Sequence, residues 1–441
     1  MTRMNTIGPL FTDLYELTMA AGYFDHHVFD SATFSVFIRN HPMQRNYFVA
    51  AGLEQVLDEL ENFRFNADEL AYLKSTTFFS DNFLSYLEDL RFTGQVHAMP
   101  EGTIFFPNEP VMEIRAPIIE AQLLETFVLN TLGFQTMIAT KGARCIRAAQ
   151  GRPLIDFSLR RTQGQDAGNK VARSTYIVGF VATSNVLAGK LYNIPVSGTM
   201  AHSFVTAFET ESDAFQAFYK SFPDSSVFLI DTYDTLEGAR NAARVAKQMR
   251  ENGHSLIGVR LDSGDMTELS RQVRKILDSE GCPDVKIFAS SGFDEFKIED
   301  VLARGAQIDA FGVGTKMGVS ADAPYLDIVY KMVRYKEREV RKLSSGKITL
   351  AGEKQVFRKS DRGGMYTEDI IGLRDDIVAD AEPLMKSVME NGRRLAPHPS
   401  LNTIREQFKN NFSRLDETIK SGNTFFPVNL SPRLKKLQEQ S

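Results

Sequence analysis

The sequence has only two cysteines, Cys145 and Cys282, and they lie far apart in no spacing typical of metal ligands. This scarcity excludes a disulfide scaffold and a structural zinc site, and it indicates a reducing compartment. Uninterrupted apolar runs are short as well, because none approaches the roughly 18 residues that a membrane-spanning helix needs. The first ten residues lack the apolar segment of a signal peptide. We therefore expect a cytoplasmic protein with no membrane-embedded part.

The chain also lacks a large excess of charge of one sign. Its 441 residues carry a net charge of −5, with 24% charged and 43% hydrophobic residues, which is ordinary for a globular protein. Without a basic surplus, the chain is not expected to bind nucleic acid or an anionic membrane. An anionic substrate would have to be held by local groups. The length allows two or three domains with large cores.

Low-complexity linkers are absent, so the domain organisation has to be read from changes in pattern. Up to about residue 120 the chain is mixed, with a helical segment at 13–22 and extended segments at 32–38, 94–99 and 110–114. A regular alternation of apolar runs and helical periodicity follows. The strand-length runs lie at 153–159, 194–200, 226–232, 256–262, 286–292 and 310–314. Such βα repetition predicts a parallel sheet, either closed into a barrel or open.

The alternation stops after about residue 325. Residues 341–350 and 354–358 are predicted to form a basic hairpin whose lysines, Lys342, Lys347 and Lys354, are solvated, and 431–441 a short polar helix. We predict an N-terminal α+β domain (1–125), an α/β domain (126–325) and a C-terminal segment (326–441) that packs with the N-terminal domain.

Polar residues follow almost every predicted strand, and in parallel α/β folds the carboxyl ends of the strands hold the catalytic residues. The six ends lie at 156–164, 198–203, 231–234, 260–265, 290–294 and 312–316. Arginines there offer forked donors to carboxylate or phosphate, and glycine-rich turns aim backbone N–H groups at anions. Acids can hold Mg²⁺ or ribose hydroxyls. The pattern predicts a pocket for a phosphorylated, hydroxyl-bearing ligand with a metal.

Each of these residues also has an ordinary structural interpretation. We assign His202, the pair Arg160 and Arg161, Asp231, and Arg260 with Asp262 to the site, and we expect Asp234 and Asp265 to be helix caps. Residues 312–318 nearly match the dinucleotide-binding fingerprint, but the third glycine comes one residue late. A phosphate-binding turn is therefore favoured there.

The sequence resembles the nicotinate phosphoribosyltransferase family over most of its length. Blocks similar to the family's motifs occur in family order at 12–19, 37–42, 50–52, 156–164, 184–189, 198–204, 260–265 and 311–315. The resemblance implies an α/β fold: an irregular (β/α) barrel-like domain beside a discontinuous α+β domain made of the N- and C-terminal parts. It also implies an ATP-dependent, ligase-type enzyme that transfers phosphoribose from 5-phosphoribosyl 1-diphosphate to nicotinate, giving nicotinate mononucleotide and diphosphate.

The resemblance further implies roles for single residues. His202 would be phosphorylated by the co-substrate ATP, with Arg260 and Asp262 as further catalytic residues. Tyr15, from the partner subunit of a homodimer, would stack on the pyridine ring. The remaining implied nicotinate contacts are Leu159, Arg160, Thr199, Ser203 and Arg260. The implied phosphoribosyl-diphosphate contacts are Asp231, Asp262, Gly292, Gly312, Gly314 and Thr315, with Asp262 as a ligand of Mg²⁺.

Three alternatives remain open at this point. A nicotinamide or quinolinate phosphoribosyltransferase would share much of the chemistry, although quinolinate would need more cations for its two carboxylates. A non-catalytic sensor of phosphoribosyl ligands would be expected to lose the histidine or the phosphate-binding glycines. A barrel phosphatase or aldolase would need a carboxylate metal cluster or a Schiff-base lysine, for which Lys316 is the one weak candidate.

Overall fold

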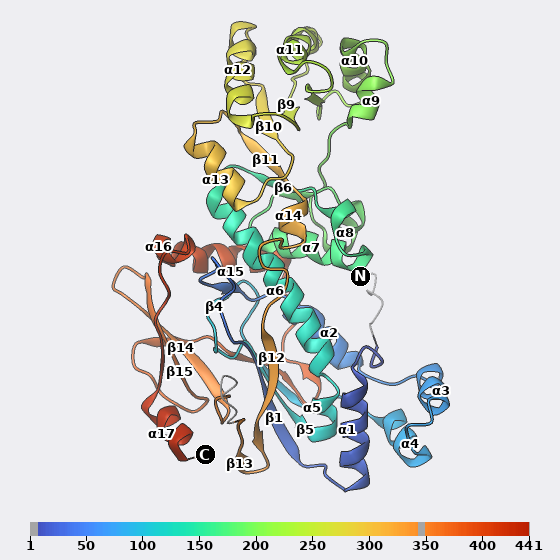
Figure 1. Cartoon of the computed structure of the whole chain (residues 1–441), viewed down its shortest axis with the longest axis vertical. Helices are drawn as coiled ribbons and strands as arrows, with labels where there is room; N and C mark the ends of the chain where they lie inside the picture. Colours follow the sequence, from blue (N-terminus) through green and yellow to red (C-terminus); the bar gives the residue numbers. More distant parts are fainter. Residues whose placement is uncertain (1–7, 343–348, 441) are drawn as a thin grey trace. The chain divides into compact units, whose positions relative to one another are not determined.

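The computed structural model describes residues 8–342 and 349–440, which form two compact units. One unit combines residues 1–140 with 323–441, so it is discontinuous in sequence, and the other comprises 141–322 (Figure 1). Helix α6 (Glu125–Ala148) runs without interruption through the first division. The domain boundaries expected after residues 125 and 325 remain predictions.

The discontinuous unit is built around a seven-stranded antiparallel sheet. Its inner strand β1 (Ser31–Ile38) lies between β5 (Met112–Pro117) and β12 (Ile328–Tyr335), so that Val36 pairs with Met112 on one side and Tyr330 on the other (Figure 1). Seven of the eight β1 residues are buried, as expected of a strand covered on both faces. The outer strands are β13 (Arg338–Glu339), β3 (Gln95–Ala98), β17 (Lys386–Glu390) and β18 (Arg393–Arg394).

Helices and a pair of short strands from the N-terminal half complete the core of this sheet. The cluster of buried apolar side chains runs from Leu17 to Leu132 and includes late residues such as Tyr330 and Met389. The elements are α1 (Leu14–Asp25), β2 (Phe48–Val49), α2 (Leu53–Asn62), α3 (Ala67–Ser75), α4 (Asp81–Asp89), β4 (Ile104–Phe105) and α5 (Ile118–Gln122).

The C-terminal part adds a four-stranded sheet, and here the predicted basic hairpin is wrong. Strand β14 (Lys354–Ser360) pairs with β15 (Tyr366–Leu373) across a tight turn at 361–365, and the described residues of the other predicted arm, 341–342 and 349–350, belong to no strand. Lys347 lies outside the described residues. Lys354 is buried, and its Nζ lies 3.1 Å from Oε1 of Glu113, so it is not solvated. The remaining elements are β16 (Ala381–Pro383), α15 (Leu401–Ser413), α16 (Glu417–Lys420), β19 (Val428–Leu430) and the predicted C-terminal helix α17 (Pro432–Gln440).

The continuous unit holds one parallel sheet of six strands in the order β7-β6-β11-β10-β9-β8. It is curled into a half-barrel, which confirms the predicted α/β, barrel-like class. The strands are β6 (Leu154–Asp156), β7 (Ala182–Thr183), β8 (Val227–Leu229), β9 (Gly258–Leu261), β10 (Lys286–Ala289) and β11 (Ala310–Val313). The connections are α7 (Gln165–Ile177), α8 (Val186–Tyr192), α9 (His202–Thr206), α10 (Glu211–Ser221), α11 (Thr235–Glu251), α12 (Met266–Ser279), α13 (Glu295–Ala303) and α14 (Thr315–Gly318).

Aspartate caps turn the chain from strand to helix at three successive strand ends. Asp234 accepts hydrogen bonds from the backbone N–H groups of the first turn of α11 at 3.0 and 2.8 Å. Asp265 does the same for α12 at 2.9 and 3.3 Å, and Asp294 for α13 at 3.0 Å. These caps satisfy donors that a helix otherwise leaves unpaired. The predicted caps Asp234 and Asp265 are confirmed.

One predicted strand is absent. Residues 194–200 contribute only an isolated bridge between Thr183 and Val196, in which Thr183 donates to the Pro195 carbonyl and accepts from the Ser197 N–H, both at 3.0 Å. Pro195 has no N–H with which to continue a ladder. The strand at this edge is the two-residue β7, which carries too short an apolar signal to be found by periodicity.

None of the helices in the described part of the chain is long and apolar enough to cross a membrane.

Candidate functional site

The side chain of Arg260, in β9, is held by four hydrogen bonds. Its Nε donates to Oγ1 of Thr199 at 2.9 Å and its Nη2 to the Met200 carbonyl at 2.8 Å. Its Nη1 donates to Asp262 at 3.1 Å and to Ser290 at 2.9 Å. A guanidinium has five N–H groups, so one on Nη2 is left to meet a ligand. Burial lowers the pKa of Arg260, while Asp262 and Asp231 raise it.

Asp231 and Asp262 follow neighbouring strands and are linked directly. Oδ2 of Asp231 accepts from the backbone N–H of Asp262 at 2.9 Å and from the Ser263 hydroxyl at 2.6 Å. Asp262 also accepts a hydrogen bond from Ser290. The other oxygen of Asp231, Oδ1, is buried and has no hydrogen-bond partner. A buried carboxylate oxygen without a partner is costly, so it is a candidate for contact with a ligand or cation.

His202 is the first residue of α9 and faces the same two strand ends. Its Nδ1 lies 3.1 Å from Oγ1 of Thr232, and its Nε2 lies 3.9 Å from Oδ2 of Asp262. The imidazole is 45% exposed, so a substrate can reach it. When Nδ1–H donates to Thr232, Nε2 keeps its lone pair and is the nitrogen available for nucleophilic attack.

A cavity of about 780 Å³ within the continuous unit is lined by Arg260 and by Ala201 and Ser203, the neighbours of His202 in sequence. Thr199, Ser203, Arg260 and Gly312 line it, as do apolar side chains of the curled sheet. Its aromatic wall consists of Phe157, Phe204, Phe218, Phe222 and Phe288. The combination of an apolar wall with a few convergent polar groups is typical of a small-molecule site.

Leu159 and Arg160 lie in a 3₁₀ turn, η1 (Leu159–Arg161), just after β6. Leu159 is 38% exposed, and Arg160 is close enough for its charge to lower the pKa of Arg260. Two guanidinium groups thus act on the same region, which suits a bound carboxylate.

The expected phosphate-binding glycines are glycines for different physical reasons. Gly292 has φ +66°, directly after Ser291 with φ +92°, and a side chain at 292 would meet nothing. At Gly312, in contrast, a Cβ would lie 2.5 Å from the Phe157 ring. Gly312 is therefore explained by packing, whereas the turn at Gly292 remains available for a ligand. Gly314 and Thr315 follow β11 and open the short helix α14.

Tyr15 belongs to the other unit, on helix α1. Its side chain is 45% exposed, and burial of the hydroxyl together with the nearby Glu125 carboxylate raises its pKa. The neighbouring Phe11, Leu14 and Met19 are also exposed, so α1 presents an apolar stripe.

Three polar residues lie within the predicted strand ends but were given no individual role from the sequence. Thr232 holds the His202 ring, Ser290 joins Arg260 to Asp262, and Asp156 anchors the end of β6. The buried Asp156 accepts from Ser158 N–H at 2.9 Å and from Thr183 at 2.8 Å, and burial raises its pKa. Position directly after an apolar strand was the available signal, but hydroxyls are too common there to be singled out.

The residues can accommodate magnesium although no group of three or more metal-ligating side chains occurs in the described part of the chain. Mg²⁺ is usually held by one or two carboxylates together with substrate phosphate oxygens and water. The unpartnered Oδ1 of Asp231 and the adjacent Asp262 provide that donor set.

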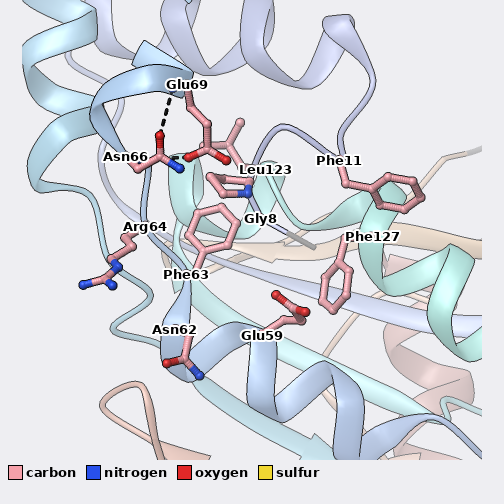
Figure 2. Close-up of a pocket in the computed structure, with 11 residues that line it drawn as sticks. Gly8, Phe11, Glu59, Asn62, Phe63, Arg64, Asn66, Glu69, Leu123 and Phe127 are labelled. Carbon is pink, nitrogen blue, oxygen red and sulfur yellow. Dashed lines mark hydrogen bonds between the residues drawn. The ribbon is translucent and has the colours of Figure 1, made fainter. Parts of the chain in front are cut away.

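A second, smaller cavity of about 210 Å³ lies in the discontinuous unit, where Phe63 and Phe127 face Glu59 and the Asn66–Glu69 cap of α3 (Figure 2). None of the predicted site residues lines it.

Comparison with known proteins identifies the family. Family models of nicotinate phosphoribosyltransferase match the chain at 10–133 (N-terminal domain), 153–362 (family core) and 377–438 (C-terminal domain). The chain belongs to the nicotinate phosphoribosyltransferase family. The resemblance inferred from the sequence blocks is therefore confirmed.

Two family members illustrate how closely the sequence agrees. Nicotinate phosphoribosyltransferase pncB2 of Mycobacterium tuberculosis is 46% identical over 432 residues, covering 97% of this chain and 92% of the relative. The Bacillus subtilis nicotinate phosphoribosyltransferase is 40% identical over 455 residues, covering 96% and 92%.

Solved structures agree with the fold. The crystal structure of human nicotinic acid phosphoribosyltransferase matches with a TM-score of 0.88 at 28% identity, covering 97% of this chain and 99% of that one. A nicotinate-nucleotide pyrophosphorylase from Pyrococcus furiosus matches with a TM-score of 0.76 at 26% identity, covering 96% and 100%.

Proposed function

We propose that this protein is a nicotinate phosphoribosyltransferase of NAD biosynthesis: it transfers the phosphoribosyl group of 5-phosphoribosyl 1-diphosphate to nicotinate, coupled to ATP hydrolysis. The observation that carries the proposal is the cluster in which Arg260, fixed by four hydrogen bonds, lines a cavity beside Asp262 and His202. Small-molecule chemistry of this kind agrees with the family to which the chain belongs.

The two arginines favour nicotinate over nicotinamide. Arg260 has a free N–H, and the exposed Arg160 is close enough for its charge to lower the pKa of Arg260. A carboxylate accepts from forked donors, whereas a carboxamide would present its own N–H groups. Thr199, Ser203 and Leu159 would complete the contacts of the pyridine ring.

Displacement of diphosphate develops positive charge on the ribose and negative charge on the leaving group. Asp262 and Asp231 would hold Mg²⁺, which would neutralise the charge that develops on the diphosphate. The carboxylate of Asp231 can also accept hydrogen bonds from ribose hydroxyls, and Gly292, Gly314 and Thr315 would offer backbone N–H groups to the 5′-phosphate. Nicotinate would attack the anomeric carbon through its ring nitrogen, with its orientation fixed by Arg260.

His202 would couple ATP hydrolysis to this transfer. Nε2 attacks the γ-phosphorus of ATP, the bond to the bridging oxygen breaks, and ADP leaves, while Nδ1–H stays hydrogen-bonded to Thr232. The phosphoryl group on Nε2 then lies near the developing positive charge of the ribose and stabilises it. Subsequent hydrolysis returns the free imidazole.

The test uses the purified protein with γ-labelled ATP. Wild type is expected to carry an acid-labile, base-stable label and to consume ATP in step with nicotinate mononucleotide. His202→Ala should lose both the label and the coupling. The matched control is His254→Ala in the same unit, where the ring pairs with Asp224 at 2.8 Å on the surface, and it should keep both. Coupled ATP hydrolysis in His202→Ala would refute the phosphohistidine.

The same assay distinguishes nicotinate from nicotinamide as the substrate, and an enzyme from a non-catalytic sensor. Nicotinate and nicotinamide offered together should yield nicotinate mononucleotide, and a preference for nicotinamide would overturn the role of the arginines. Binding of 5-phosphoribosyl 1-diphosphate without any turnover would favour the sensor alternative.

Assembly and location are part of the proposal. A homodimer in which the partner subunit supplies Tyr15 is supported by the exposed apolar stripe of α1, because such a stripe on a helix is usually covered. A cytoplasmic location is supported by Cys145 and Cys282, which are both unpaired. Size measurement in solution and cell fractionation test these two points, and a monomer or an exported protein would contradict them.

A further inference from the structure

Two lysines of the continuous unit converge on the loops after β10 and β11. Lys297, in the first turn of α13, donates from Nζ to the Ser291 carbonyl at 2.7 Å and lies over the Phe293 ring, 4.7 Å from its centre. Lys316, two residues after Gly314, has its Nζ 3.6 Å from Oδ2 of Asp294. The ammonium group of Lys297 thus contacts the turn formed by Ser291 and Gly292, both of which have positive φ, and that of Lys316 contacts Asp294, two residues further on.

The two ammonium groups are close enough to affect one another. Burial lowers the pKa of Lys297, and the charge of Lys316 lowers it further, while Asp294 acts in the opposite direction. Two cations and one carboxylate leave a net charge of +1 at this place. Like charges held together repel unless an anion joins them. The strained, left-handed φ of Ser291 is a further cost that tends to persist at ligand-binding turns.

We propose that Lys316 is a direct ligand of the 5′-phosphate of the phosphoribosyl substrate, and that Lys297 is a positioning residue that holds the Ser291–Gly292 turn against that phosphate. This inference rests on the proposed function. Lys316 is suited to the first role because its side chain is half exposed and its contact with Asp294 is long, so it can turn to a ligand. Lys297 is suited to the second because it is already bonded to the turn.

The position of Lys316 after β11 indicates that it contacts the 5′-phosphate of the substrate and not the diphosphate. Asp231 and His202 act at the ends of β8 and β9, whereas Lys316 follows β11, and the sheet order is β11-β10-β9-β8. Three strand spacings separate β11 from β8, about 14 Å. A substrate with phosphate at one end of its ribose and diphosphate at the other can span that edge, with its diphosphate at the aspartates.

The test measures ligand affinities and kinetics of Lys316→Met in the full-length protein. A hydrogen bond to a charged group is worth enough for its loss to weaken binding by about 10- to 100-fold. We expect that weakening for ribose 5-phosphate in calorimetry, and a matching rise in the KM of the phosphoribosyl diphosphate substrate. The affinity for inorganic diphosphate, the KM for nicotinate, the kcat at saturation and the labelling of His202 should stay near wild type.

Three further variants sharpen the result. Lys316→Arg keeps the charge and should restore affinity to within a few-fold. Lys275→Met, at an exposed position of α12, is the control and should bind ribose 5-phosphate like wild type. Lys297→Met should raise the KM of the phosphoribosyl diphosphate substrate with little change in kcat, since it disturbs the turn and not the reacting atoms.

The outcomes separate this inference from the proposed function. If Lys316→Met binds ribose 5-phosphate with normal affinity, or loses as much affinity for diphosphate as for ribose 5-phosphate, the inference is overturned. Neither result contradicts the proposed function. Weakened ribose 5-phosphate binding in a protein that makes no nicotinate mononucleotide supports the phosphate ligand and refutes the proposed function. A wild type that does not bind ribose 5-phosphate overturns the inference as well.

Discussion

Lys141 is the centre of a buried ion network, and its removal should destabilise the protein markedly. Its Nζ lies 2.6 Å from Glu295 and 2.7 Å from Asp322, and Nε of Arg144 lies 2.7 Å from the other oxygen of Glu295. Lys141 has no exposed surface and Glu295 is 4% exposed. Two cations face two carboxylates, so the network is neutral as built.

Lys141→Met keeps most of the side-chain volume but leaves this buried group with a net charge of −1. Breaking a buried pair by removing one partner costs about 3–5 kcal/mol. In a unit of this size each kcal/mol lowers Tm by about 2–4 °C, so we expect a fall of about 6–20 °C. Because Glu295 directly follows the cap Asp294 and starts α13, the loss should also loosen the turn at Gly292.

Lys170→Met is the matched control. Lys170 is also buried, but its partner Asp166, at 2.7 Å, is 75% exposed and remains solvated when the lysine is removed. Loss of a pair with an exposed partner is expected to cost at most about 1 kcal/mol. Thermal and urea unfolding of both variants measure the difference. If Lys141→Met loses no more stability than Lys170→Met, the network does not stabilise the fold and the reasoning fails.

Two further predictions concern the discontinuous unit. Burial, and to a lesser degree the nearby Asp369 carboxylate, raises the pKa of Glu109 well above 4.5. Protonated Glu109 therefore contributes stability that is fully present below pH 4.5, and this contribution is lost as the pH rises toward the pKa of the folded state. Glu109→Gln, which is neutral at any pH, should therefore lose less stability than wild type between pH 5 and pH 8 in urea unfolding, and equal slopes would contradict the assignment. Tyr15→Ala should raise the KM for nicotinate by about 10-fold or more through lost ring stacking. Mixing Tyr15→Ala with His202→Ala should restore ATP-coupled activity, because one site of a mixed dimer would then be intact. No recovery on mixing would exclude a tyrosine supplied across the interface.

The sequence pattern predicted the parallel sheet because most of its strands are apolar runs that end in polar residues, whereas the barrel-like form was implied by the family resemblance. Asp234 and Asp265 could be recognised as caps from the helices that follow them. It also brought His202, Arg260, Asp231 and Asp262 together, since parallel strands end at one edge. The local pattern wrongly predicted a strand at 194–200. Apolar residues flank Pro195 there, but the segment makes only an isolated bridge between Val196 and Thr183.

Tertiary context decided the remaining cases. Lys354 was expected to be solvated, but it is buried against Glu113, a residue distant in sequence that no local pattern connects to it. Thr232 and Ser290 belong to the site because the fold places the His202 ring beside Thr232 and the Arg260 guanidinium beside Ser290. Gly312 was assigned to phosphate on its motif, although contact with Phe157 is sufficient to require glycine there.

The pairing of β1 with β12 has a consequence for how the chain is made on the ribosome. Strand β1 ends at Ile38, but the neighbour that covers its second edge begins at Ile328, after the entire parallel sheet has been synthesised. The parallel unit can therefore fold first, while β1 and β5 wait with an open edge. An exposed strand edge invites pairing with other chains. Nascent chains stalled before residue 328 should thus be the species most in need of chaperones, and the final closing of the antiparallel sheet, a contact of long sequence separation, should be a slow step of folding.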